Sequence, residues 1–273
     1  MALSRRKANL GLACSLSSTA LFAIAPSAIA QQQPRRCNPG DPPDWRKFEA
    51  GDFLWPKLPG TYVPFRSGSS AGAAEEKAEW MRRRADLVGR LAAEGSSSAT
   101  ALAAELRNMT FEQFHARYVN GARPGENVPF KGGQVGTGHI AILEIDGSHR
   151  PYVIEAMPAV GVQRVAYDDW LKARICEMVW HGRMGGLAPD KRASVATEAA
   201  RHLGRPYDFW NLRLDDTSSF YCSKLVWLAV REATGLAIDG DSSPGPRFWV
   251  SPKRLLSARG IVKLYNPQDY YHR

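Results

Sequence analysis

The stretch SFYCSKLVW, residues 219–227, carries a cysteine at the start of an apolar segment. Ser219 is a residue type that caps helices and Gly235 is one that ends them, so we expect a helix from Ser219 to Thr234. Cys222 would then lie in the first helical turn, where unpaired backbone N–H groups and the helix dipole favour an anion such as a thiolate. The alternative is that Cys222 is a small, unreactive core residue. Without other evidence, a cysteine in a helix favours this alternative.

A thiol nucleophile needs a base, and the base needs a group that orients it. The stretch GHIAILEI, residues 138–145, reads as a strand that opens with His139, directly after the glycine-rich run 132–138. Residues 146–148 form a turn, and Glu155 lies on the next strand. Pairing across the turn brings the Glu155 carboxylate beside one ring nitrogen of His139, which leaves the other nitrogen for the thiol. The alternative for His139 is a surface residue at the end of a strand, and the alternative for Glu155 is a salt bridge at the edge of the sheet.

Two kinds of periodicity follow one another along the chain. Runs of β-forming residues predict strands at 53–55, 139–145, 152–156, 161–166, 175–180 and 261–265. The four strands between residues 139 and 180 suggest an antiparallel meander. Helical spacing and capping residues predict helices at 74–94, 99–107, 110–119, 189–203, 219–234 and 251–259. Strands grouped together, with helices before and after them, indicate an α+β domain in which an antiparallel β-sheet packs against helices. Residues 66–127 are then an α-helical insertion.

The first thirty residues have the pattern of an export signal. Basic Arg5, Arg6 and Lys7 precede an apolar run, and Ala-Ile-Ala at 28–30 is a small-x-small cleavage site. Cleavage after Ala30 predicts a periplasmic or secreted protein. A membrane anchor is the alternative, but hydroxyl side chains interrupt the apolar run, which is also short for a span. We expect no membrane span in the mature chain.

The chain is basic and long enough to bury one core. Its 273 residues are 44% hydrophobic, and its formal net charge is +9. Loss of the three positive charges in the signal would leave +6, which suits an acidic surface such as a cell envelope and does not require nucleic acid. Residues 31–44, rich in Pro, Gln and Arg, are predicted to be a flexible N-terminal arm that precedes a catalytic domain at 45–273.

Three cysteines remain after the signal: Cys37, Cys176 and Cys222. An odd number in an exported protein suggests one disulfide and one free thiol, so a Cys37–Cys176 bond is possible with Cys222 free. No C-x-x-C or H-x-x-x-H spacing is present, so we predict no metal site and no cofactor. His181 follows a predicted strand, and we expect it at the surface.

The order of these segments resembles a known family. The resemblance to the YiiX-like family, circularly permuted relatives of the NlpC-type papain-fold hydrolases, rests on Gly51-Asp52, GHIAI (138–142), VIEA (153–156), GRPYDF (204–209) and FYCSKLVW (220–227). In that permuted order the histidine strand precedes the cysteine helix, as it does here. The resemblance covers roughly residues 45–60 and 128–265 and implies a circularly permuted papain-like fold.

The resemblance also implies a Cys–His–polar triad. The nucleophile of the family corresponds to Cys222, its base to His139 and its third residue to Glu155. Tyr207 matches a tyrosine that precedes the nucleophile in the related enzymes, and its hydroxyl would help the Cys222 backbone N–H bind an oxyanion. A half-buried packing role is the alternative for Tyr207.

The sequence therefore predicts an exported cysteine hydrolase that cleaves an amide bond through a thioester intermediate. The expected substrate is a peptide, a peptidoglycan-derived peptide or a lipid acyl group. The stretch between Asp52 and His139 is longer than the usual loop of the family, so the substrate of the relatives does not transfer to this chain. A thiol acyltransferase or lipid-modifying enzyme on the same fold, and a non-catalytic envelope-binding protein, remain alternatives. The sequence does not indicate the oligomeric state.

Overall fold

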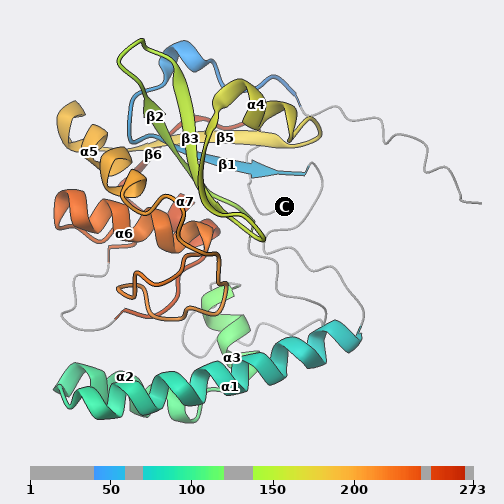
Figure 1. The fold of residues 1–273 in the computed structure, drawn as a ribbon, viewed down its shortest axis with the longest axis vertical. Helices are drawn as coiled ribbons and strands as arrows, with labels where there is room; N and C mark the ends of the chain where they lie inside the picture. The colour runs from blue at the N-terminus through green and yellow to red at the C-terminus, as the bar shows by residue number, and fades with distance from the viewer. Residues whose placement is uncertain (1–39, 59–69, 120–137, 241–246, 268–273) are drawn as a thin grey trace, which may run out of the picture. The chain divides into compact units, whose positions relative to one another are not determined.

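A six-stranded antiparallel sheet forms the centre of the computed structural model, which describes residues 40–58, 70–119, 138–240 and 247–267 (Figure 1). The strand order is β4-β3-β2-β1-β5-β6. The strands are β1 (Phe53–Lys57), β2 (Ala141–Ile145), β3 (Pro151–Met157), β4 (Gly161–Ala166), β5 (Met178–Met184) and β6 (Ile261–Tyr265). The predicted meander is confirmed in β2, β3 and β4, and β1 inserts between β2 and β5.

Six α-helices of at least five residues, and shorter helical turns, accompany the sheet in the described ranges. They are η1 (Trp45–Lys47), α1 (Ser70–Glu94), α2 (Ser97–Arg107), α3 (Phe111–Phe114), η2 (His115–Val119), α4 (Tyr167–Lys172), α5 (Pro189–Ala200), α6 (Cys222–Thr234) and α7 (Pro252–Leu256). The capping box predicted at Thr110 is confirmed, because its side chain and that of Gln113 each accept a hydrogen bond from the other's backbone N–H.

The helix that carries the cysteine begins later than the sequence predicts. It starts at Cys222 rather than Ser219, with Tyr221 as the extended N-cap residue. The chain stays extended before that point because the backbone N–H of Phe220 bonds to the Pro206 carbonyl at 2.9 Å, and the Phe220 carbonyl accepts from the Asp208 N–H at 3.0 Å. Cys222 is therefore the first helical residue, even closer to the positive end of the helix dipole than expected.

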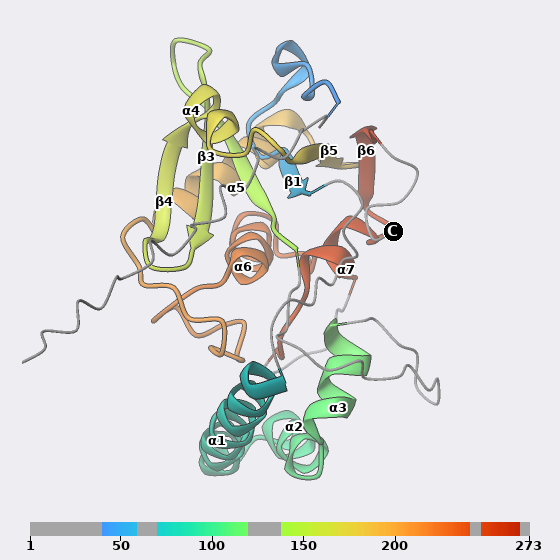
Figure 2. The ribbon, with the colours of Figure 1, turned by 90° about the vertical axis from the view of Figure 1, so that its right-hand side faces the viewer.

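Each face of the sheet is covered by different elements. Apolar residues of one face, such as Ile142 and Ile154, belong to a large core with the buried residues of α5 and α6. The other face packs Leu54 and Val153 against Tyr167 and Trp170 of α4. Figure 2 shows α6 and α4 on opposite sides of β3. The sequence did not predict α4. Its place over β3 brings Trp170, and Arg174 after the helix, into contact with Glu155 of that strand.

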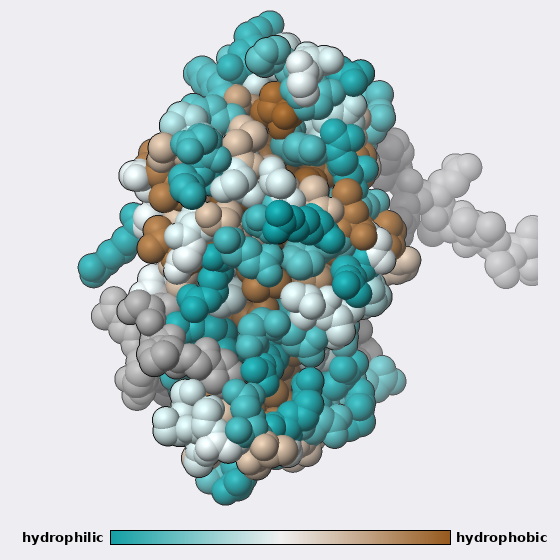
Figure 3. Space-filling view, turned by 60° about the vertical axis from the view of Figure 1, so that its left-hand side comes forward, coloured by the Kyte–Doolittle hydropathy of each residue, from teal (hydrophilic) through white to brown (hydrophobic). Residues whose placement is uncertain are grey.

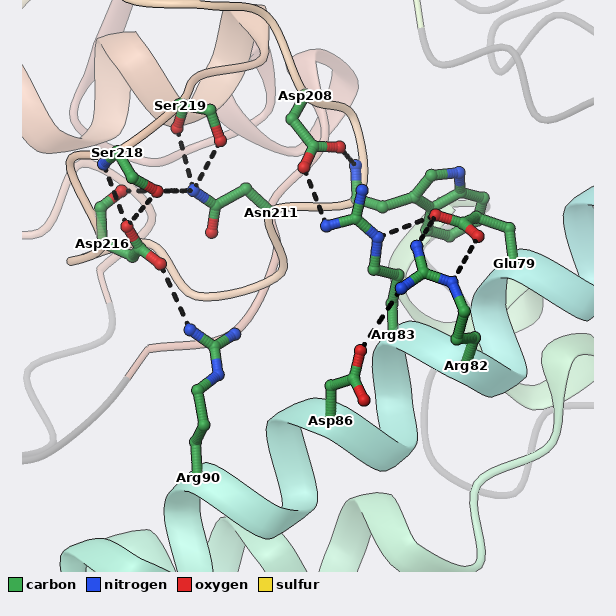
Figure 4. A network of polar contacts seen from close by, with 11 residues as sticks. Glu79, Arg82, Arg83, Asp86, Arg90, Asp208, Asn211, Asp216, Ser218 and Ser219 are labelled. Atoms are coloured by element: carbon green, nitrogen blue, oxygen red, sulfur yellow. Dashed lines mark hydrogen bonds and ion pairs between the residues drawn. The ribbon is translucent and has the colours of Figure 1, made fainter.

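The helical segment α1–α3 lies beyond α6, on the side away from the sheet in both ribbon views (Figures 1 and 2). Ion pairs join α1 to the loop that leads into α6: Arg83 meets Asp208 at 2.9 Å, and Arg90 meets Asp216 at 3.3 Å (Figure 4). Apolar packing accompanies these pairs, because the Trp80 ring stacks on Phe114 with centroids 4.3 Å apart.

One face of the molecule carries both hydrophilic and apolar residues. Figure 3 shows hydrophilic residues interspersed with scattered apolar ones on that face. Single exposed apolar residues are normal on a folded domain. Within the described ranges, no helix combines the length and the apolar character that a membrane crossing requires.

Contacts divide the chain into two units, residues 1–36 and residues 37–273, and every described residue belongs to the second. The predicted export signal, most of the predicted arm and the glycine-rich run at 132–137 lie outside the described residues. Cys176 is disulfide-bonded and Cys222 is a free thiol. The partner of Cys176 lies outside the described residues, so the pairing with Cys37 stays a prediction.

Candidate active site

Cys222 lies at the N-terminus of α6 with only 6% of its surface exposed. The first backbone N–H groups of a helix have no acceptor within the helix, so they point at this end. The next residue fixes the start of the helix, because the Ser223 hydroxyl donates to the Val250 carbonyl at 2.8 Å. The sulfur therefore stands at a rigid position beside the positive end of the helix dipole.

His139 lies just before β2 and reaches Glu155 on β3. Its Nε2 is 2.7 Å from the Glu155 Oε2 atom. The strand register explains this contact: Ile142 pairs with Ile154, so continuing the ladder by one residue sets Ala141 opposite Glu155. His139 precedes Ala141 by two residues and therefore faces the same side of an extended chain. The contact expected from the hairpin between His139 and Glu155 is confirmed.

The Glu155 carboxylate is buried and surrounded by donors. Its Oε2 accepts from Trp170 Nε1 at 2.8 Å and from the Arg174 guanidinium at 2.9 Å. Its Oε1 accepts from Gln163 Nε2 at 2.9 Å. A buried carboxylate with this set of partners is held in one orientation, and so is the imidazole that it contacts.

Sequence reasoning missed Gln163 and Arg174 as parts of this site. Gln163 had a usable signal, because it stands opposite Glu155 in the β3–β4 ladder and the short turn fixes that register. Arg174 had none, since it follows α4, which was not predicted. Trp170 of α4 is buried and also donates to Glu155.

The electrostatics of the site favour an ion pair. Burial lowers the pKa of His139, but hydrogen bonds to Cys222 and Glu155 and the charges of both raise it to about 9. Burial raises the pKa of Glu155, whereas its bonds to His139 and Trp170 and the charges of His139 and Arg174 bring it down to about 2. Near neutral pH the His139 ring is thus an imidazolium beside an ionised Glu155 carboxylate.

A cavity of about 290 Å³ opens onto this pair. Cys222, His139 and Tyr207 all line it, together with apolar side chains such as Met157 and Phe209. Burial and the nearby charge of Cys222 raise the pKa of Tyr207, so its hydroxyl stays protonated and able to donate. Three of the four residues that the sequence singled out therefore line a cavity close to the size of a small ligand site, and the fourth, Glu155, contacts the His139 ring without lining the cavity.

Two other sequence expectations come out differently. His181 is not at the surface: it is 2% exposed in β5, and its Nε2 lies 2.7 Å from Asp52. The surface position predicted for His181 is wrong because β5 begins and ends later than predicted. His181 therefore lies at a buried position within the strand rather than beyond its end. Asp52 also pairs with Arg183 at 2.6 Å, so the Gly51-Asp52 match belongs to a buried polar cluster outside the cavity lining.

No group of three or more histidine, cysteine or acidic side chains in the described ranges is arranged to hold a metal ion. The prediction of no cofactor stays a prediction.

Comparisons with known proteins bear on the family of the chain. YiiX of Escherichia coli K12 is 32% identical over 101 residues, which are 37% of this chain and 48% of that protein. The chain thus spans about half the length of that curated relative. A solved structure titled as the metalloprotein YiiX of Escherichia coli O157:H7 is 17% identical, with a TM-score of 0.43 over 80% of this chain and 96% of that one. A family model described as the permuted papain-like amidase enzymes YaeF/YiiX, the C92 family, matches residues 111–266. Because that match covers more than half of the 273 residues, the chain belongs to the permuted papain-like amidase family of YaeF and YiiX.

Proposed function

We propose that the protein is a cysteine hydrolase that cleaves an amide bond, with Cys222 as nucleophile, His139 as base and Glu155 as the group that orients the base. The observation that carries the proposal is geometric: His139 lies 2.7 Å from the Glu155 carboxylate and lines the same cavity as Cys222, the first residue of α6. The hydrogen bonds of His139 to Cys222 and Glu155 are also what raise its pKa to about 9. Such a pKa keeps the imidazole protonated beside a thiolate at neutral pH, the state from which a thiol attacks fastest.

The reaction follows from these positions. The Cys222 sulfur attacks the amide carbonyl, and its electron pair forms the C–S bond while the carbonyl oxygen becomes an oxyanion. The backbone N–H of Cys222 and the Tyr207 hydroxyl stabilise that oxyanion. His139 gives its proton to the departing amine, which leaves a thioester. His139 then takes a proton from water, and the resulting hydroxide releases the acid and restores the thiolate.

We also propose that the protein is exported and acts in the periplasm or outside the cell. The pattern of residues 1–30 supports this, and so does the disulfide at Cys176, because disulfides persist in oxidising compartments. Mass spectrometry of the protein recovered from the periplasm or medium tests it: we expect a mature chain beginning at Gln31, and an uncut Met1 terminus would contradict export by cleavage.

Thiol alkylation tests the proposed pair without knowledge of the substrate. Limiting iodoacetamide should label Cys222 rapidly, with a rate that depends on pH. In His139→Ala the rate at neutral pH should fall by about tenfold or more, because one pKa unit of lost ion pairing corresponds to a factor of ten. Peptide mapping by mass spectrometry measures the label at Cys222.

His149→Ala serves as the matched control, since His149 lies exposed in the turn between β2 and β3. Its labelling rate should equal that of the parent protein. Slow labelling of Cys222 at the same rate in the parent, His139→Ala and His149→Ala would contradict an activated thiol and favour a non-catalytic binding protein.

A further inference from the structure

A second cavity, of about 440 Å³, adjoins the catalytic one. It is formed by residues 40–42 on one side and by α4 with the turn after it on the other. Arg174 and Glu177 line both cavities, so these two side chains are a shared wall. The volume is in the range of small-molecule sites, and the shared wall would let one extended ligand occupy both.

The charged groups of this second cavity favour a cation. Lys172 is bound to Asp169 at 2.9 Å, and Arg174 is bound to Glu155 at 2.9 Å, so each is already paired with a carboxylate. Asp41 and Asp168 also line the cavity, and neither pairs with a cation among the residues that the structure describes. Within the described lining of the cavity, the charge that has no such partner is therefore negative.

Glu177 in the shared wall adds a third carboxylate. Its nearest guanidinium atom is Arg174 Nε at 3.6 Å, a long contact, and burial raises the pKa of this glutamate. A cation on the cavity side would offset that burial. Lys57, which also lines the catalytic cavity, has its ammonium 5.8 Å from the centre of the Trp180 ring.

The second cavity also has an apolar side. Leu171, Pro42 and Ile175 line it, and Ile175 is 75% exposed. A ligand that fits this lining has a short aliphatic stem that ends in a charged nitrogen.

We propose that the second cavity is a substrate subsite that takes an aliphatic chain ending in an ammonium or guanidinium group, with Glu177 and Asp168 as its carboxylates. This inference rests on the proposed function, because it assumes that the scissile bond lies over Cys222. It gives the substrate a class: an amide that carries a cationic side chain or amine a few bonds from the reacting carbonyl.

Two alkylating probes of equal length test the subsite. N-(aminopentyl)iodoacetamide carries an ammonium and N-pentyliodoacetamide carries none, and both form a C–S bond at Cys222 with loss of iodide. The measured quantity is the ratio of their second-order rates, each divided by the iodoacetamide rate of the same variant. We expect the cationic probe to be favoured about fivefold, the size that a screened ion pair supports.

Variants test whether the preference for the cationic probe arises from the second cavity. Glu177→Gln and Asp168→Asn should each lower the ratio, whereas Asp190→Asn, which removes an exposed carboxylate in the first turn of α5 that is not part of the described lining of the cavity, should keep it. Asp168→Asn keeps the test decisive if Glu177→Gln does not fold.

A ratio near one in the parent protein, or one unchanged in both variants, would overturn the subsite. Failure of the proposed function is separate, since it would appear as iodoacetamide labelling that does not depend on His139.

Discussion

At the scale of single residues, Glu155 is the most constrained group of the site. It is 1% exposed, and four side chains donate to or pair with its two oxygens. Because its pKa is lowered, its ionised form stabilises the fold above the ordinary pKa of a glutamate, and this contribution is lost as the pH falls towards about 2. The carboxylate is therefore charged throughout the range in which the thiol reacts.

Replacing that charge should weaken the thiol. In Glu155→Gln the neutral amide supports the imidazolium less, so we expect Cys222 to react with iodoacetamide about tenfold more slowly at neutral pH. Alkylation quenched at a series of times, followed by peptide mapping, gives the labelling rate of Cys222. Circular dichroism verifies that the variant is folded.

Glu144→Gln is the matched control for that variant. Glu144 is a partly exposed glutamate of β2 that pairs with Arg164 instead of His139. Its variant should keep the parent rate. Equal rates for the Glu155 and Glu144 variants would mean that the Glu155 charge does not act on the pair.

The positions of the candidate residues could be predicted from the sequence where a motif held the residue, and their catalytic roles stay predictions. Cys222 and His139 stand in short, ordered motifs, and Glu155 followed from pairing across one turn. Arg174 was not accessible in this way, because its contact depends on how α4 packs over β3. The position of His181 was wrong for a related reason: a small shift in strand bounds changes burial completely.

At the scale of elements, the helical segment α1–α3 is joined to the neighbourhood of Cys222 by aromatic rings. Trp80 of α1 stacks on Phe114, and Phe114 meets Trp249 edge-on with centroids 5.3 Å apart. Trp249 in turn stacks on Tyr221, the N-cap residue of α6, at 5.6 Å. This continuous packing connects the segment to the start of the nucleophile helix.

Two substitutions on α1 separate that packing from its ion pairs. Trp80→Ala removes a fully buried ring and should lower the free energy of unfolding by about 3–5 kcal/mol. Arg83→Ala breaks half-exposed pairs with Glu79 and Asp208 and should cost less than about 1 kcal/mol.

Urea unfolding followed by circular dichroism measures both values. If the Arg83 variant loses as much stability as the Trp80 variant, the ion pairs of Figure 4 rather than the rings hold the segment in place.

Element bounds show what local sequence signals miss. The helix predicted from Ser219 starts three residues later, because Phe220 makes long-range backbone bonds that no local pattern reveals. In contrast, the capping box at Thr110 and the meander β2–β4 were predicted correctly, since both depend on residues close together in the chain.

At the scale of the whole molecule, the central claim concerns two residues that are far apart in the chain. His139 comes from the sheet and Cys222 from α6, and α6 packs on β2 and β3. The order of the segments, and with it the permuted papain-like family, could be predicted from the sequence. The contact between the two side chains could only be hypothesised, because it depends on the packing of α6 against the sheet.

The titration of the His139 ring tests that contact most directly. Nuclear magnetic resonance of histidine-labelled protein, with the His139→Gln variant to assign the signal among the six histidines, gives its pKa. We predict a value of about 9 in the parent protein, and a clearly lower value in Cys222→Ala, where the thiolate that holds the proton is gone. A His139 ring that titrates near the ordinary 6.5 of histidine in both proteins would contradict the pairing and the mechanism built on it.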